Sequence, residues 1–167
     1  GLGDVYKRQA SAYELADGEA YDGPLSSYFS EANAMLTMQH LSEGIGYRVV
    51  GTQKHVDAEV WLEDVLRRYE GTHATGGSEY ATHVEVFRQQ SDGRHRFEIL
   101  GHPVWKRYYG MSNLIVRVSD GSEESKAHTL LVNAHIDSTI PSPGAVDDAA
   151  GVAIMLEALR ALTAVSY

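Results

Sequence analysis

The chain has 167 residues, of which 43% are hydrophobic and 22% charged, proportions typical of a globular domain with a buried core. Its net charge of −9 argues against nucleic-acid binding, and the sequence contains no polybasic segment for an anionic membrane surface. The sequence contains no cysteine, so any metal ion must be bound by His, Asp and Glu. The longest apolar stretch, 151–162, contains two charged residues and is too short to span a bilayer.

The two ends of the chain are expected not to be native protein. Residues 1–9 read like the in-frame translation of a transposon-based sequencing adapter, and residues 164–167 match the reverse complement of the same element. Residues 10–28 are polar, contain a proline, and predict a lead-in segment. We therefore expect residues 29–163 to form the N-terminal part of one domain that continues beyond the chain, and leave both ends out of the fold argument.

Two amphipathic helices are predicted first. Ser30 can cap one helix, which Gly44 and Gly46 end, and the other runs from Gln53 to Tyr69 with Gly71 as its stop. Apolar residues recur at helical spacing in both segments, so each helix is expected to bury one face. The inward positions are Ala34, Met38, Leu41 and Ile45 in the first helix, and Ala58, Leu62, Val65 and Tyr69 in the second.

The middle of the chain predicts strands. Thr82–Gln89 and Arg94–Leu100 are rich in strand-forming residues, and Ser91–Gly93 between them contains an Asp-Gly pair that favours a tight turn. After a loop, Asn113–Val118 predicts a third strand, and Gly121–Ala127 predicts a charged turn. Trp105, Tyr108 and Tyr109 in that loop are expected to belong to the core, with a pocket as the alternative.

The last third predicts a strand–loop–helix unit. The nearly continuous apolar run Thr129–Ala134 is typical of a strand buried on both faces, and a buried helix begins near Ala149. Its inward positions are expected to be Val152, Leu156, Leu159 and Leu162. Together these elements predict an α/β fold, a mixed central sheet flanked by helices, in which functional sites form beyond the carboxyl ends of strands.

Four residues at the end of the predicted last strand carry the chemistry. His135 follows the strand, Asp137 lies two residues on, and Asp147 and Asp148 enter the last helix. Imidazole and carboxylate are the ligands that zinc takes without cysteine, and a ligand histidine usually has its other ring nitrogen held by a carboxylate. Taken singly, a structural histidine and a helix N-cap remain the commoner alternatives. The other seven histidines show no metal-ligand spacing and are interpreted as surface or loop residues: His40, His55, His73, His83, His95, His102 and His128.

The sequence around these residues resembles a known family. His135-Ile-Asp-Ser and Pro143-Gly-Ala-Val-Asp-Asp-Ala-Ala-Gly are similar to the signature of the M28 family of zinc exopeptidases. Upstream, Gly46-Tyr-Arg-Val-Val-Gly-Thr and Asn113-Leu-Ile-Val-Arg-Val resemble its membrane-anchored branch, the endoplasmic reticulum metallopeptidase 1 type and the fungal vacuolar membrane proteases. The resemblance implies the zinc-exopeptidase fold, which is expected to be incomplete in this chain. It also implies a location at the vacuolar or endoplasmic reticulum membrane, on the lumenal side. Membrane spans are possible in a full-length protein, but none is expected in this chain.

The resemblance also implies residue roles. His135 would bind one zinc ion, Asp147 would bridge two, Asp137 would orient His135, and Asp148 would follow a cis peptide bond behind the metal ligands. In the family, two zinc ions activate a water that attacks a peptide bond at the N-terminus of a substrate, while a glutamate moves the proton. That glutamate and the remaining ligands lie later in the family's sequence, and Glu157 is not expected to replace them.

Two other functions stay open at this stage. A glutaminyl-cyclase-like acyltransferase shares the fold and uses one zinc ion, but tends to have Ser where Asp148 stands. A non-catalytic receptor-type module on the same fold would have lost its metals, against which His135 and Asp147 argue. For this chain itself we expect poor zinc binding, no hydrolysis, and an apolar face left exposed around its last strand and helix.

Overall fold

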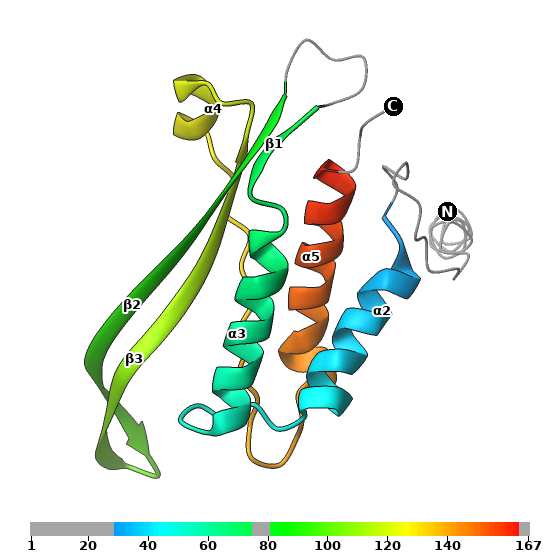
Figure 1. The fold of residues 1–167 in the computed structure, drawn as a ribbon. Coiled ribbons are helices and arrows are strands. Elements are labelled where there is room, and N and C mark those ends of the chain that lie inside the picture. The colour runs from blue at the N-terminus through cyan, green and yellow to red at the C-terminus, as the bar shows by residue number, and fades with distance from the viewer. Residues whose placement is uncertain (1–28, 75–80, 164–167) are drawn as a thin grey trace, which may run out of the picture.

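The computed structural model describes residues 29–74 and 81–163, so the expectations for residues 1–28 and 164–167 lie outside the described residues. Figure 1 shows helices α2 (Glu31–Gln39), α3 (Gln53–Arg67) and α5 (Ala150–Thr163) beside a three-stranded antiparallel sheet. The predicted α/β class is confirmed. Helices α3 and α5 contribute to one core with the sheet, and α2 packs on α5.

Helix α2 starts as predicted, and the helical run that continues it ends at the predicted Gly46. The Ser30 side chain accepts a hydrogen bond from the Asn33 backbone N–H at 3.3 Å, which satisfies a donor at the helix start. The helix continues as the π-helical segment η1 (His40–Ile45), after which Gly46 has a positive φ of 86° that favours glycine. The Ser30 backbone N–H donates to the buried Glu157 at 2.7 Å, which fixes α2 to α5.

The core contains the predicted positions Ala58 of α3 and Val152, Leu156 and Leu159 of α5, whereas the predicted Leu62, Val65 and Tyr69 of α3 are only partly buried against it. Its buried members are Leu41, Ala58, Leu66, Val84, Val86, Ala149, Val152, Leu156 and Leu159. Two predictions are wrong here. Leu162 is exposed because it lies at the margin of the apolar stripe, and His55 is buried next to Glu59, with 3.9 Å between Nδ1 and Oε1, instead of lying at the surface.

The sheet differs from the predicted one in its long hairpin. Strand β1 (Gly71–His73) pairs with β2 (Thr82–Ile99), and β2 pairs along its length with β3 (His102–Ser119). The predicted turn at Ser91–Gly93 is wrong, because Asp92-Gly93 forms a β-bulge in which Asp92 accepts a hydrogen bond from the Gly110 N–H at 2.6 Å. The chain turns instead at Leu100 and Gly101, whose φ values of 50° and 80° suit a two-residue hairpin loop.

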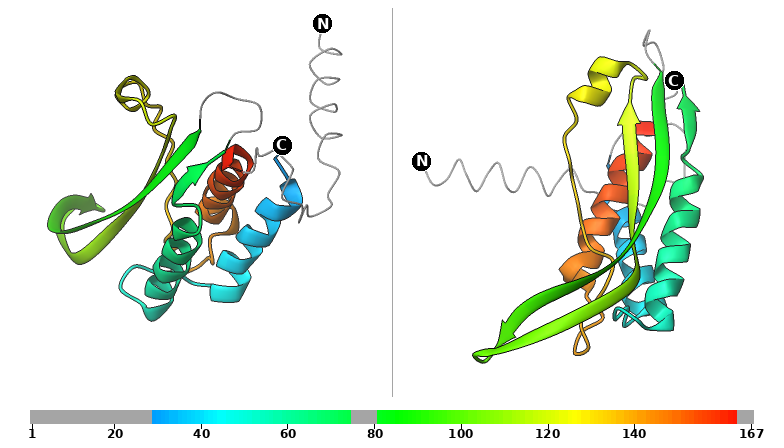
Figure 2. Two further views of the ribbon diagram at one scale, coloured as in Figure 1. Left: turned by 45° about the horizontal axis from the view of Figure 1, so that its top comes forward. Right: turned by 90° about the vertical axis from the view of Figure 1, so that its left-hand side faces the viewer.

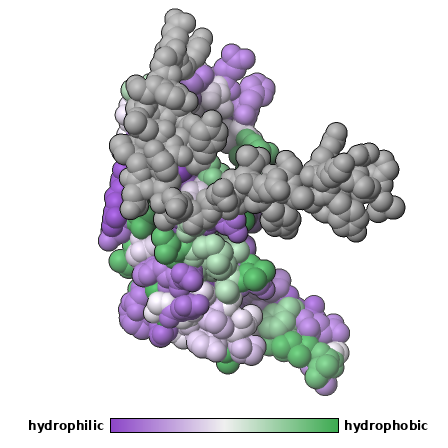
Figure 3. Space-filling view, turned by 90° about the vertical axis from the view of Figure 1, so that its right-hand side faces the viewer, coloured by the Kyte–Doolittle hydropathy of each residue, from purple (hydrophilic) through white to green (hydrophobic). Residues whose placement is uncertain are grey.

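The aromatic residues of β3 lie in a strand rather than in a loop, so the predicted core cluster is wrong. Trp105 is 62% and Tyr109 72% exposed, while Tyr108 lies across from Gly93, where a Cβ atom would overlap its side chain. The far end of the hairpin runs away from the helices (Figure 2), and hydrophobic residues lie on the surface of this projecting part, at the lower right of Figure 3.

The segment predicted as the last buried strand forms no strand. Leu130, Leu131 and Val132 are exposed in an extended segment, and none of the described strands pairs with it. A strand needs a hydrogen-bonded neighbour, and without one an apolar run does not become buried. The predicted charged turn before it is a short helix, α4 (Glu123–Ala127), capped by Ser122, whose side chain accepts from the Ser125 N–H at 3.1 Å.

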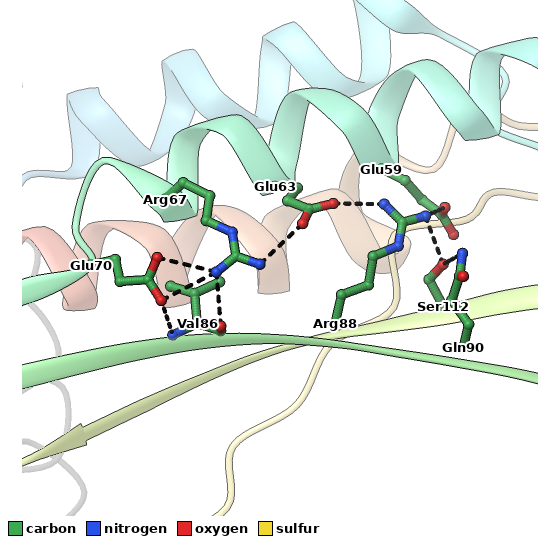
Figure 4. A network of polar contacts seen from close by, with 8 residues as sticks. All are labelled: Glu59, Glu63, Arg67, Glu70, Val86, Arg88, Gln90 and Ser112. Carbon is green, nitrogen blue, oxygen red and sulfur yellow. Dashed lines mark hydrogen bonds and ion pairs between the residues drawn. The ribbon is translucent and has the colours of Figure 1, made fainter.

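A polar network joins α3 to the hairpin (Figure 4). Arg88 of β2 contacts Glu63 at 2.6 Å and the buried Glu59 at 3.1 Å. Arg67 of α3 donates to the Val86 carbonyl at 2.9 Å. These contacts fix the position of the hairpin on α3 with charge-assisted hydrogen bonds, which are stronger than neutral ones.

Candidate functional site

A tight turn brings the candidate residues together. Gly144 has a left-handed backbone with φ of 63°, and a Cβ there would overlap the Asp147 carbonyl oxygen. The turn leads into η2 (Ala145–Ala149), in which Asp147 and Asp148 have non-helical backbone angles, and then into α5. The chain therefore returns to His135 after 12 residues, and glycine is required at the position where it reverses.

The His135 ring lies between two carboxylates. Its Nε2 atom is 2.9 Å from Oδ1 of Asp147, and its Nδ1 atom is 3.2 Å from Oδ1 of Asp137 and 3.1 Å from the Asp137 carbonyl oxygen. All three side chains are accessible to solvent. The residues predicted to bind metal, His135 and Asp147, are thus in contact, and Asp137 lies where a residue that orients the ring would lie.

Asp148 points toward the backbone rather than toward the ring. Its Oδ2 atom accepts a hydrogen bond from the His135 N–H at 3.2 Å, and its Oδ1 atom accepts one from the Gly151 N–H at 3.1 Å. The peptide bond between Asp147 and Asp148 is cis, as expected. Asp148 therefore joins the His135 segment to the first turn of α5, while Asp147 is left to face the imidazole.

The surroundings of His135 favour its protonated form. Partial burial lowers its pKa, but the hydrogen bond to Asp147 and the negative charge of Asp137 outweigh this effect, so the pKa is raised above its ordinary value of 6.5. Both ring nitrogens face acceptor oxygens, an arrangement that the doubly protonated ring satisfies. A cation at Nε2 would take the place of one of these protons.

Arg48 connects the two segments that carry the site, and no motif in the sequence points to this role. Its guanidinium is fully buried and donates to carbonyl oxygens of Ile136 at 2.8 Å and Pro143 at 2.9 Å, and also to Gly144 at 3.3 Å. The same group donates to the carbonyls of Leu41 and of Gly46 in the η1 region. One side chain thus connects the His135–Asp137 segment, the turn before Asp147, and the end of η1.

The backbone of Arg48 adds two more contacts. Its N–H donates to the Ser138 hydroxyl at 2.9 Å, and its carbonyl accepts from the Ser138 N–H at 3.1 Å. Burial lowers the pKa of Arg48, and the negative charge of Asp137 acts in the opposite direction. Because the guanidinium's hydrogen-bond acceptors are carbonyl oxygens spread along the chain, no spacing rule could have identified this residue.

The donor set fits zinc in kind but falls short in number. His135 and Asp147 supply one nitrogen and one oxygen, whereas a catalytic zinc usually has three protein ligands. Within residues 29–74 and 81–163, no group of three or more His, Asp or Glu side chains is arranged to hold a metal ion. Two ligands of a tetrahedral zinc lie about 3.3 Å apart, so the 2.9 Å contact must open slightly, which the exposed Asp147 side chain permits.

A hollow elsewhere on the surface does not involve these residues. It is lined by β1, by the adjoining parts of β2 and β3, and by the turn into α4, including His83, Glu85 and Lys126. None of the four candidate residues contributes to it. The side chains of His135, Asp137 and Asp147 are instead open to solvent.

Comparison with known proteins assigns the segment that carries the site. Residues 113–166 match the sequence model described as Peptidase family M28. The chain is 41% identical over 142 residues to a putative endoplasmic reticulum metallopeptidase 1 of Schizosaccharomyces pombe, covering 85% of this chain and 17% of the relative. It is 26% identical over 142 residues to leucine aminopeptidase 1 of Penicillium rubens, covering 83% of this chain and 31% of the relative.

A third relative is the vacuolar membrane protease of Yarrowia lipolytica, 26% identical over 147 residues, with 88% of this chain and 12% of the relative covered. The chain thus spans less than a third of the length of each of these relatives. No solved structure matches it. Among the described residues, no helix is long and apolar enough to cross a membrane. Residues 113–166, which include all four candidate site residues, are thus similar to peptidase family M28.

Proposed function

We propose that this chain is part of a zinc-dependent exopeptidase, an aminopeptidase that uses two zinc ions to activate water. The observation that carries the proposal is the 2.9 Å contact between Nε2 of His135 and Oδ1 of Asp147, within a segment that matches a peptidase family. The substrate class is the N-terminus of a peptide, which the similarity to a leucine aminopeptidase supports. The names of two relatives support a location at the endoplasmic reticulum or vacuolar membrane, with the site on the lumenal side.

The residues of this chain have distinct tasks in the proposed site. His135 provides the Nε2 lone pair to one zinc ion, and Asp137 keeps a proton on Nδ1 and so fixes the orientation of the ring. Asp147 provides two carboxylate oxygens and can bridge two ions, while Asp148 holds the backbone of His135 in place. Zinc, when bound, lowers the pKa of water toward neutrality and stabilises negative charge that develops on the substrate carbonyl.

Zinc binding by the chain itself tests these ligand roles. With two ligands we expect weak binding, with a Kd of about 10 µM to 1 mM in isothermal titration calorimetry. His135→Ala and Asp147→Ala should each abolish it, whereas His95→Ala, an exposed histidine on the hairpin, should leave it unchanged. Unaltered zinc binding in both site variants would rule out the assignment of His135 and Asp147.

The reaction itself is tested in a protein as long as the relatives, because this chain spans 17% of the fission-yeast relative. We expect such a protein to bind two zinc ions and to release the N-terminal residue from short peptides, and we expect this chain alone to hydrolyse nothing. One tightly bound ion with cyclisation of N-terminal glutamine would instead identify a glutaminyl cyclase. No bound ion at all would identify a non-catalytic module.

A further inference from the structure

The far half of the β2–β3 hairpin forms an arm, defined here as residues 91–111. It begins at the bulge of Ser91 and Gly93 and runs away from the helices in all the ribbon views (Figures 1 and 2). It carries four Lys or Arg residues against two carboxylates, in a chain whose net charge is −9. The sequence shows no polybasic run because these cations are spread over two strands, and the hairpin brings them together.

The pairing register concentrates arginine on one face of the arm. Arg94 lies directly opposite Arg107, and Arg96 lies opposite Trp105, so side-chain alternation places all four residues on the same face. The Arg94 guanidinium lies 5.6 Å from the centre of the Trp105 ring. Like charges directly across a strand pair are unfavourable, and the ion pairs found among the described residues do not include Arg94, Arg96 or Arg107. By the same alternation Glu98 also lies on this face, so three arginines stand against one carboxylate and the face keeps a net positive charge.

The tip of the arm is aliphatic. Leu100 is 95% exposed and has a φ of 50°, a backbone conformation that suits glycine or asparagine and is unfavourable for leucine. Its neighbour Ile99 is half exposed. Leucine at this position costs free energy in water on both counts, because of its conformation and because of its exposed apolar surface.

We propose that the arm docks on an anionic lipid membrane, with Ile99 and Leu100 entering the interface and the arginine face contacting lipid phosphate groups. Ile99 and Leu100 at the tip, the exposed Trp105 opposite Arg96 behind them, and Arg94 opposite Arg107 farther back match the order of apolar, interfacial and headgroup layers. An acidic peptide would account for the arginines but would leave Leu100 without a partner. This inference does not rest on the proposed peptidase activity.

Binding to vesicles tests the proposal with the whole chain. We expect the chain to sediment with vesicles of phosphatidylcholine and phosphatidylserine in a 7:3 ratio, and not with vesicles of pure phosphatidylcholine. Raising the salt concentration from about 0.1 M to about 0.5 M should release it, since the electrostatic part of the attraction falls off within a Debye length.

Matched variants locate the contact. Arg94→Gln/Arg107→Gln should weaken vesicle binding about tenfold or more without lowering Tm, because it removes two like charges that face each other. The control Arg68→Gln/Lys126→Gln removes the same charge from outside the arm, at the exposed Arg68 and the partly buried Lys126, and should leave binding nearly unchanged. Leu100→Asn suits the backbone at the tip, so it should weaken binding while keeping or raising Tm.

Several outcomes would overturn the proposal. These are no binding to anionic vesicles, equal binding to neutral ones, equal losses in the arm and control variants, or full binding by Leu100→Asn. Preferential capture of the chain by polyglutamate, with loss of vesicle binding in competition, would reassign the face to an acidic polypeptide and end the membrane proposal.

Discussion

A buried arginine that donates to backbone carbonyl oxygens organises the candidate site. Arg48 is surrounded by backbone carbonyl oxygens from three segments, and its guanidinium matches their directions with its several N–H groups. If it were removed, these carbonyls would be left buried and unsatisfied, and an unsatisfied buried group costs about 1–3 kcal/mol. Arg48 therefore contributes to stability and to the geometry around His135 at the same time.

We predict that Arg48→Met lowers the free energy of unfolding by about 3 kcal/mol, as measured by urea denaturation. The control Arg68→Met, at an exposed position, should change it by no more than about 0.5 kcal/mol. Since Arg48 also holds Ile136 and Gly144, the folded fraction of Arg48→Met should show changed NMR shifts for the His135 ring. Unchanged His135 shifts, with stability reduced, would limit Arg48 to a purely stabilising role.

The sequence predicted which four residues form the candidate site, but not the buried arginine that holds their backbone in place. His135, Asp137, Asp147 and Asp148 lie within one short stretch, where a local motif determines which side chains can meet. Arg48 lies 88 residues before the Ile136 carbonyl that it binds, and backbone acceptors leave no trace in residue types. The buried position of His55 was missed for a related reason, since helix faces are predicted from apolar residues and a histidine gives no such signal.

At the scale of elements, helices were predicted well and the hairpin poorly. Helical periodicity and the Ser30 cap are local properties, and both correspond to what the structure contains. Asp-Gly suits a tight turn and a bulge equally, because both need an acceptor side chain and a flexible residue. The choice between them depends on pairing between distant strands, in which Asp92 meets the Gly110 N–H across the sheet.

The junction between α3 and the hairpin gives the next prediction. Arg88→Met leaves the buried carboxylate of Glu59 without its closest cation, so we expect a loss of about 2 kcal/mol in the free energy of unfolding. The control Arg117→Met removes a more accessible, partly buried ion pair with Glu85 from the same hairpin and should cost no more than about 1 kcal/mol. Equal losses in the two variants would show that the burial of Glu59 does not increase the contribution of its ion pair to the free energy of unfolding.

The same junction has a pH dependence. The hydrogen bond from Arg88 lowers the pKa of Glu63 below its ordinary value of 4.5 in the folded state. A lowered folded-state pKa contributes stability above pH 4.5 that is lost as the pH falls through the folded-state value. The stability difference between the wild-type chain and Arg88→Met should therefore shrink in acid, in urea titrations between pH 7 and pH 3.

At the scale of the whole molecule, the described part of the chain leaves apolar surface without cover. Leu130, Leu131, Val132, Ile140 and Val146 are exposed around the candidate site. The apolar run of residues 129–134 predicted a buried strand, and the sequence could not reveal that none of the described strands would pair with it. An extended, unpaired apolar segment favours association with other chains, because it offers both hydrogen-bonding groups and apolar side chains.

We therefore predict concentration-dependent self-association of this chain, measured by sedimentation velocity between about 5 and 200 µM. Leu131→Lys should reduce it while leaving Tm nearly unchanged, because the wild-type leucine side chain is exposed and loses no packing. Leu36→Lys, at an exposed leucine of α2, controls for the added charge and should leave the association in place. If both variants reduce association equally, net charge governs it, and the exposed segment before His135 has no special part in holding chains together.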